Sequence, residues 1–173
     1  DVYEQLKANV RQRKLIQLGI SLGDTNGASP QTATWQFNFL FDLQSDESEP
    51  QAIELLRNAG LDFARHASQG IEPRKFAESF RMSGLPSNQN LRWLAFNGKY
   101  DFAYLMSLFC PLPQSRSDFM KHLFELCPNL FDVKHLGEGG LCKQLEREGI
   151  SPIGQHQAGY DSHLTMQLFN RRW

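Results

Sequence analysis

The sequence predicts one α/β domain spanning residues 1–173, in which a mixed β-sheet is flanked by helices. Several segments carry apolar residues at helical spacing, and two early segments alternate apolar with other residues, as half-buried strands do. Two further short apolar runs lie among the helical segments, an order that favours a layered sheet covered by helices. With 173 residues and 40% hydrophobic side chains, the chain has the size and composition of one globular domain.

The first part of the chain predicts a short helix followed by two strands. Three apolar residues at four-residue spacing indicate the helix: Val2, Leu6 and Val10. Residues 16–22 then alternate as a strand does, and Gly23 to Gly27 supply turn residues. Four aromatic residues recur at every second position of the next segment: Trp35, Phe37, Phe39 and Phe41. We expect them to form the inner face of a second strand, paired antiparallel with the first.

The middle of the chain is predicted to be helical. Two helical patterns end at Gly60 and Gly70, where glycine can adopt the left-handed conformation that closes a helix. Pro73 fits the first position of a third helix, because proline lacks the N–H that is unpaired there.

The last part predicts two short strands and four helices. The run 91–96 indicates a buried strand, and a helix follows from about Asp101. Ser117 is the expected N-cap of a helix through Leu126, which Cys127-Pro128 should end. The remaining expected elements are a strand at 130–133 and helices at 141–148 and 161–169.

Charge, cysteines and missing motifs exclude several classes of protein. Lys and Arg number 18 against 19 Asp and Glu, so no broad cationic face is available. No apolar run approaches the roughly 20 residues of a membrane span, and we expect a soluble protein. The three cysteines form no C-x-x-C pair, which indicates free thiols in a reducing compartment: Cys110, Cys127 and Cys142. Phosphate-binding glycine loops and a G-x-S-x-G serine motif are absent.

Two short motifs could carry chemistry. Asp101 stands at a predicted helix start after a buried strand, where a carboxylate is favoured by the helix dipole and can also be presented at a sheet edge. His156 lies in a loop five residues before Asp161, so that a metal-binding carboxylate and a proton-accepting imidazole could act together. A capping Asp and an exposed loop His explain the same residues equally well. The other histidines are expected on the surface or on helix faces: His66, His122, His135 and His163.

Seven segments stand in order along the chain: Ile16-Gln17-Leu18-Gly19, Thr34-Trp35-Gln36-Phe37-Asn38-Phe39, Ile53-Glu54-Leu55-Leu56, Trp93-Leu94, Tyr100-Asp101-Phe102, Phe131-Asp132-Val133-Lys134 and Gln155-His156-Gln157-Ala158-Gly159. Together they closely resemble the Pop/Caf deadenylase subunit of the CCR-NOT complex, over essentially the whole chain. The resemblance implies a ribonuclease-H-like fold of the DEDD exonuclease superfamily. It also implies removal of messenger RNA poly(A) tails in the 3′-to-5′ direction, with release of AMP.

The same resemblance implies cofactors, site residues and partners. Four acidic residues of that superfamily hold two divalent ions, Mg²⁺ or Mn²⁺, and a His acts as general base. Asp101 matches the third acidic ligand, Asp161 the fourth and His156 the base. The implied partners are poly(A) RNA, the scaffold and second deadenylase subunits of CCR-NOT, and regulators of the BTG/Tob type. The implied location is the cytoplasm, including processing bodies, and the nucleus, with no membrane attachment.

The chain departs from the family pattern in four places. The first two acidic ligands belong to an Asp-Thr-Glu segment on the family's central first strand, and no Asp-x-Glu occurs in this sequence. The stretch between Lys134 and Gly139 is short, Asn97 stands where many members have His, and Tyr160 replaces a smaller residue. We expect the missing strand to lie upstream and the 173 residues alone to be inactive. A non-catalytic docking module of the same complex is the alternative function.

Overall fold

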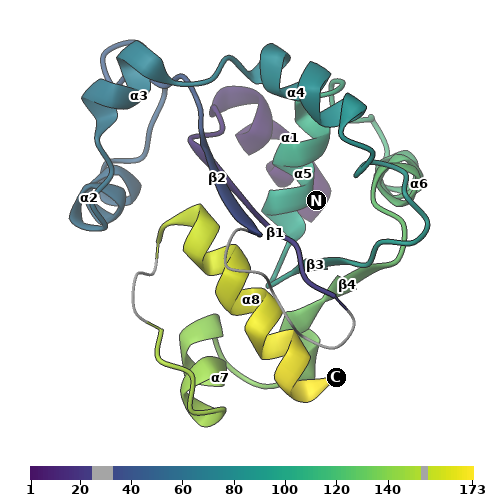
Figure 1. Cartoon of the computed structure of the whole chain (residues 1–173). Helices are drawn as coiled ribbons and strands as arrows, with labels where there is room; N and C mark the ends of the chain where they lie inside the picture. Colours follow the sequence, from purple (N-terminus) through teal and green to yellow (C-terminus); the bar gives the residue numbers. More distant parts are fainter. Residues whose placement is uncertain (25–32, 153–155) are drawn as a thin grey trace.

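The strands form two separate ladders in the computed structural model, which describes residues 1–24, 33–152 and 156–173 (Figure 1). Strand β1 (Gln17–Ser21) pairs antiparallel with β2 (Thr34–Asn38), as predicted. Strand β3 (Trp93–Ala95) pairs in parallel with β4 (Leu130–Asp132). Residues 25–27 of the predicted turn and Gln155 lie outside the described residues.

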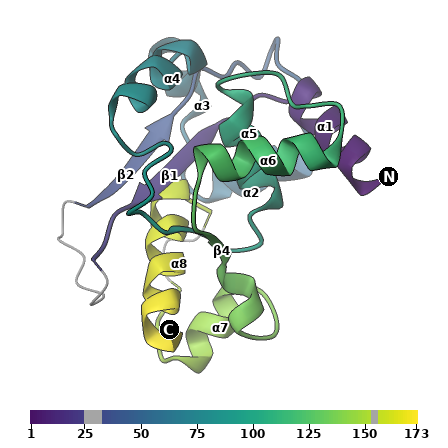
Figure 2. The same ribbon diagram turned by 90° about the vertical axis from the view of Figure 1, so that its right-hand side faces the viewer.

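The helices follow the predicted order and give a mixed α/β fold. Their bounds are α1 (Val2–Gln12), α2 (Pro50–Asn58), α3 (Phe63–Gln69), α4 (Pro73–Met82), α5 (Lys99–Ser107), α6 (Arg116–Leu126), the 3₁₀ helix η1 (Val133–Leu136), α7 (Leu141–Arg147) and α8 (Ala158–Arg172). Figure 2 shows α8 running below the β1–β2 ladder with α7 beside it, while α1 and α4 lie above the ladder and α5 and α6 to its right. No helix in the described part of the chain is long and apolar enough to cross a membrane.

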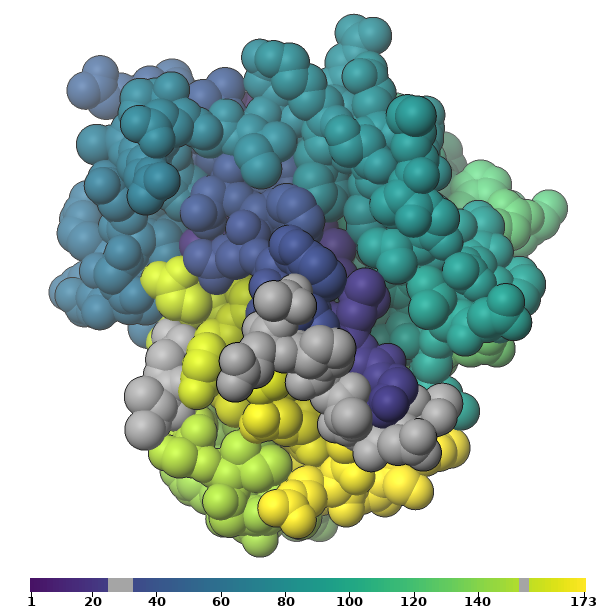
Figure 3. All heavy atoms as spheres, viewed as in Figure 1, coloured from purple at the N-terminus to yellow at the C-terminus, as the bar shows by residue number. Residues whose placement is uncertain are grey.

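Three apolar clusters hold these elements together. The largest joins α1, β2, α4, α5 and α6 around buried residues such as Phe39, Phe76 and Met106. A second cluster lies between η1, α7 and α8, and a third surrounds Phe41 near α2 and α3. The space-filling view shows the atoms of α8 in yellow packed against those of β2 in blue (Figure 3). The amino end of α8 is therefore fixed by the β1–β2 ladder, which determines where its first turn points.

The predicted aromatic face of β2 is only partly correct. Phe39 and Phe41 are fully buried, and Phe37 packs edge-on against Phe76 with ring centroids 4.9 Å apart. Trp35, however, is 44% exposed. It lies at the end of the ladder opposite Ile20, beyond the cover that Phe76 gives to Phe37 and Phe39.

Two predicted helix ends are also wrong in detail. The N-cap of α6 is Ser115, whose hydroxyl accepts from the Asp118 N–H at 3.0 Å, and not Ser117. Gly60 has the expected left-handed conformation (φ +89°), but Gly70 is extended (φ −61°). Gly70 is required for another reason, since a Cβ there would overlap the backbone of Leu40.

His66 is not a surface residue. Its ring is buried at 4% exposure, and its Nδ1 lies 2.9 Å from the carbonyl oxygen of Phe39. The imidazole thus satisfies a backbone group where β2 leads toward α3, which is a structural role.

Candidate active site

Asp101 is placed by a turn that a second carboxylate holds in shape. The turn follows β3, and α5 begins directly after it with Asp101 in its first turn. Asp132, at the end of β4, accepts hydrogen bonds from the backbone N–H groups of Asn97 at 2.8 Å and Gly98 at 3.2 Å. It also accepts from the Lys134 N–H at 3.0 Å. Asp132 therefore ties the carboxyl end of β4 to the start of α5.

The carboxylate of Asp101 carries an unfavourable charge. Although part of the side chain is open to solvent, the protein atoms around it raise its pKa by desolvation. A backbone hydrogen bond opposes this rise, and the negative charges of Asp132 and Asp161 add to it. Asp101 and Asp161 thus interact across the site, although one lies on α5 and the other on α8.

Asp161 is placed by the packing of α8 on the β1–β2 ladder. A Cβ on Gly19 of β1 would overlap the carbonyl of Ala158, so the first turn of α8 can sit this close only because residue 19 lacks a side chain. The Gly159 N–H donates to the side-chain oxygen of Gln36 at 2.9 Å.

The residue before α8 is fixed by a set of glutamines. The side-chain oxygen of Gln157 accepts from Gln36 at 2.9 Å and from Gln17 at 3.3 Å. Its amide nitrogen donates to the carbonyl of Ala59 at 2.6 Å. This network explains why glutamines and glycines recur in the segments 16–19, 34–39 and 156–159: they join one strand pair to one helix start.

His156 and Asp161 share a pocket of about 360 Å³. Tyr104 of α5 and Lys14 also line it, beside aliphatic residues of α2 and of the segment just before β1. His156 is exposed and has a positive φ of 66°, which turns the chain into α8. Burial raises the pKa of Asp161, while the charge of His156 and a backbone hydrogen bond from it lower that pKa.

Among the three predicted site residues, Asp161 interacts electrostatically with both Asp101 and His156. Asp161 and His156 also line one pocket, whose lining does not include Asp101. Within the described ranges, no group of three or more His, Cys, Asp or Glu side chains is arranged to hold a metal ion. The sequence analysis gave no role to Tyr104, which lies one turn after Asp101. Its three-residue spacing from Asp101 was a usable signal, because such residues share a helix face.

No family model matches the chain. Several curated proteins are similar to it over nearly its whole length, including the following two. One is the poly(A) ribonuclease pop2 of Schizosaccharomyces pombe, 40% identical over 179 residues, which cover 96% of this chain and 53% of that protein. The other is the probable CCR4-associated factor 1 homolog 7 of Arabidopsis thaliana, 40% identical over 185 residues, with 98% and 67% covered. The chain therefore spans about half to two thirds of these relatives.

Solved structures agree with this similarity. The Mg²⁺- and Mn²⁺-bound form of S. pombe Pop2p superposes with a TM-score of 0.94 at 41% identity, over 98% of this chain and 71% of that one. Yeast CAF1 co-crystallised with the NOT1 MIF4G domain gives a TM-score of 0.85 at 26% identity, over 98% and 70%.

Proposed function

Because the chain belongs to the Pop2/CAF1 family of poly(A) ribonucleases, we propose that the protein shortens poly(A) RNA from its 3′ end by metal-dependent hydrolysis, releasing AMP. The observation that carries this proposal is the electrostatic interaction of Asp101 on α5 with Asp161 on α8, together with the pocket that Asp161 shares with His156. Carboxylate oxygens are the ligands that Mg²⁺ and Mn²⁺ prefer.

The two carboxylates fit a cation because each is costly in its charged form. Burial raises both pKa values, and the Asp161 charge raises that of Asp101 further. A divalent ion held between them offsets this negative charge. The chemistry that bound Mg²⁺ or Mn²⁺ supplies is a lowered pKa of an attacking water and neutralisation of charge on the scissile phosphate. The solved S. pombe relative, described as a Mg²⁺- and Mn²⁺-bound form, supports this choice of ions.

His156 is the proposed general base. It lines the same pocket as Asp161, and its exposure lets a water reach the imidazole. An imidazole that takes a proton from the attacking water acts as a general base. Holding the proton at the imidazole keeps it away from the carboxylates that bind the ions.

Two ions need more carboxylates than Asp101 and Asp161. We assign the remaining ligands to an Asp-x-Glu strand that lies outside this sequence and pairs between β1 and β3. The edges of the two ladders support this assignment. Among the described residues the two ladders are not hydrogen-bonded to each other, so β1 and β3 each have an open edge. Open edges of this kind are normally covered by another strand.

The proposed setting is the CCR-NOT complex, in the cytoplasm and the nucleus. The similarity to a CAF1 chain co-crystallised with the NOT1 MIF4G domain supports a scaffold partner of that type. The second deadenylase subunit and regulators of the BTG/Tob type are the other proposed partners.

The deciding experiment uses the full-length protein and 3′-end release of AMP from labelled oligo(A). We expect cleavage in Mg²⁺ or Mn²⁺ and none after excess chelator. An oligo(A) blocked at its 3′ end is the control for direction and should stay intact. Cleavage that persists in chelator contradicts the metal site. If no condition gives cleavage, yet the protein binds the scaffold domain, it is instead a docking module without activity.

A further inference from the structure

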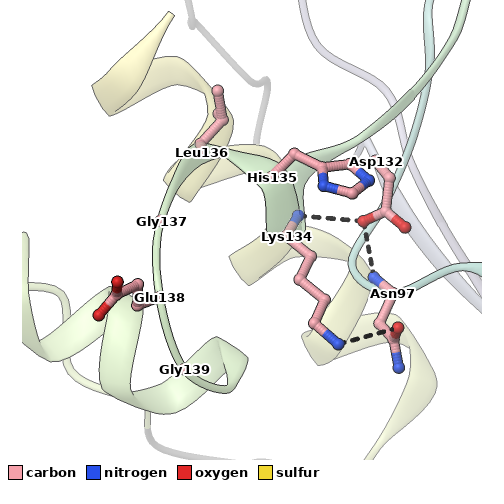
Figure 4. A pocket seen from close by; sticks show the side chains of 8 residues that line it. All are labelled: Asn97, Asp132, Lys134, His135, Leu136, Gly137, Glu138 and Gly139. Carbon is pink, nitrogen blue, oxygen red and sulfur yellow. Dashed lines mark hydrogen bonds between the residues drawn. The ribbon is translucent and has the colours of Figure 1, made fainter.

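A second pocket lies at the carboxyl end of β4, separate from the one that holds His156. Its volume is about 620 Å³, and Asn97, Asp132 and residues 134–139 line it. Figure 4 shows Asn97, Asp132, Lys134 and His135 together on one side and Glu138 on the other. The carboxyl ends of parallel strands are where α/β sheets commonly bind ligands, and β3 and β4 both end here.

In this pocket, one carboxylate oxygen accepts hydrogen bonds from the backbones of two residues, Asn97 and Lys134, whose side chains also bond to each other. Oδ1 of Asp132 accepts from the backbone N–H of Asn97 at 2.8 Å and from that of Lys134 at 3.0 Å. The Lys134 ammonium then donates to the side-chain oxygen of Asn97 at 3.1 Å. Asn97 has a positive φ of 58°, a conformation that Asn tolerates better than most residues. Asp132 and Asn97 thus hold the Lys134 side chain in one orientation.

Lys134 has no carboxylate partner in the part of the chain that the structure describes, since no ion pair there includes it. An ammonium group has three donors, and the bond to Asn97 uses one of them. The neighbouring candidate site holds carboxylates whose negative charges interact, since those of Asp132 and Asp161 both act on Asp101. A polyanionic substrate that approaches these carboxylates therefore needs a cation beside them, and Lys134 supplies one.

We propose that Lys134, held by Asn97 and Asp132, binds a backbone phosphate of single-stranded RNA in this pocket, next to the Asp101–Asp161 site. The inference rests on the proposed nuclease function and assigns a contact to its substrate. Asn97 and Asp132 are positioning residues for Lys134. Because the contact is to phosphate, it contributes affinity without selecting a base.

The test measures the binding of a fluorescein-labelled oligo(A) to the full-length protein by fluorescence anisotropy. EDTA is present so that no turnover occurs. Salt dependence isolates the ionic contact, since each phosphate contact on a single strand contributes about 0.7 to the slope of log affinity against log salt. A phosphate contact with that slope strengthens binding about 5-fold more at 0.1 M salt than at 1 M salt, and removing the contact loses this difference.

We expect Lys134→Gln to lower the slope by about 0.7, and to weaken oligo(A) and oligo(U) binding about equally. Lys134→Arg should retain most of the affinity for oligo(A). Asn97→Ala should lower that affinity less than Lys134→Gln does. Lys121→Gln is the matched control, because Lys121 is exposed on α6 and its substitution also removes one positive charge. Equal slopes for Lys134→Gln and Lys121→Gln overturn the proposal.

Cleavage of oligo(A) in Mg²⁺, measured on the same variants, separates this inference from the proposed function. Normal cleavage together with a salt slope that does not depend on Lys134 contradicts the phosphate contact and leaves the proposed nuclease function standing. Binding that depends on Lys134, without cleavage by the wild-type protein, supports the phosphate contact and contradicts the proposed nuclease function. A wild-type protein that neither binds nor cleaves oligo(A) overturns both.

Discussion

Asp101 is held in a position that costs the folded protein stability. Desolvation raises its pKa, and the charges of Asp132 and Asp161 raise it further, so the folded state keeps the proton to a higher pH than the unfolded state does. As pH rises from the ordinary Asp value, about 3.9, through the raised pKa, the free energy of unfolding falls. The cost is therefore present above the raised pKa and absent below the ordinary Asp pKa.

We therefore predict that Asp101→Asn is more thermally stable than the wild-type protein at pH 7 in chelator, while the difference vanishes near pH 3. Circular dichroism melts of the metal-free full-length protein at several pH values measure this. Glu54→Gln, an exposed change on α2, is the control for loss of one negative charge. Oligo(A) cleavage by Asp101→Asn should fall by at least about 100-fold, because even outer partners of metal ligands cost 10- to 100-fold. A variant that is less stable at pH 7 contradicts the assignment of an unfavourable charge.

The role of His156 is tested by a change that respects its backbone. Its φ of 66° strains most substitutions, and Asn tolerates it, so His156→Asn removes the imidazole with little distortion. If His156 is the general base, turnover should fall roughly 10²- to 10⁴-fold while Mn²⁺ affinity stays within a few-fold of wild type. Single-turnover cleavage and calorimetric Mn²⁺ binding measure the two quantities. A parallel loss of both would make His156 a ligand or a structural loop residue.

At the scale of elements, the contact between β1 and the start of α8 decides the geometry of the site. Gly19→Ala places a methyl group against the carbonyl of Ala158, so the helix must shift. We predict a loss of roughly 1–3 kcal/mol in the free energy of unfolding, as overpacking typically costs. Urea denaturation measures it. Gly140→Ala is the matched control, because a Cβ there meets nothing within 4 Å and its φ of −76° suits alanine. Equal effects of the two changes would mean that this approach does not constrain α8.

Most elements could be predicted because their signals are local. Pro73 begins α4 and the Cys127-Pro128 pair ends α6, as the chemistry of proline requires. The errors occur where a residue far along the chain determines the local conformation or the exposure of a side chain. Gly70 is needed for the backbone of Leu40, and the exposure of Trp35 depends on how far Phe76 reaches along the ladder. Spacing along the chain contains neither fact.

The candidate site shows the same division. Asp101, His156 and Asp161 were found from short motifs and a family resemblance, but the electrostatic interaction between Asp101 on α5 and Asp161 on α8 arises only in the folded chain. Asp132 was missed as a positioning residue. Its partner Asn97 lies 35 residues upstream, so only the parallel pairing of β3 with β4 makes the contact visible.

At the scale of the whole molecule, a bound ion should couple α5 and α8, which otherwise share few direct contacts. Asp101 lies on α5, in the largest apolar cluster, whereas Asp161 lies on α8, whose buried residues belong to the second cluster. An ion held by both carboxylates stabilises only the state in which α5 and α8 are both in place. At a hundred times its dissociation constant, it adds about 2.7 kcal/mol to the stability of that state.

We predict that Mn²⁺ slows amide hydrogen exchange in α5 and α8 together, and leaves α6, which carries no proposed ligand, less affected. Exchange in the full-length protein with and without Mn²⁺, followed by mass spectrometry, measures this. In Asp161→Asn the protection of α5 by Mn²⁺ should fall along with that of α8, because one ligand then no longer ties the two helices. Protection of α5 that survives this change in full would show that the ion is held on the α5 side alone, and would refute a shared site.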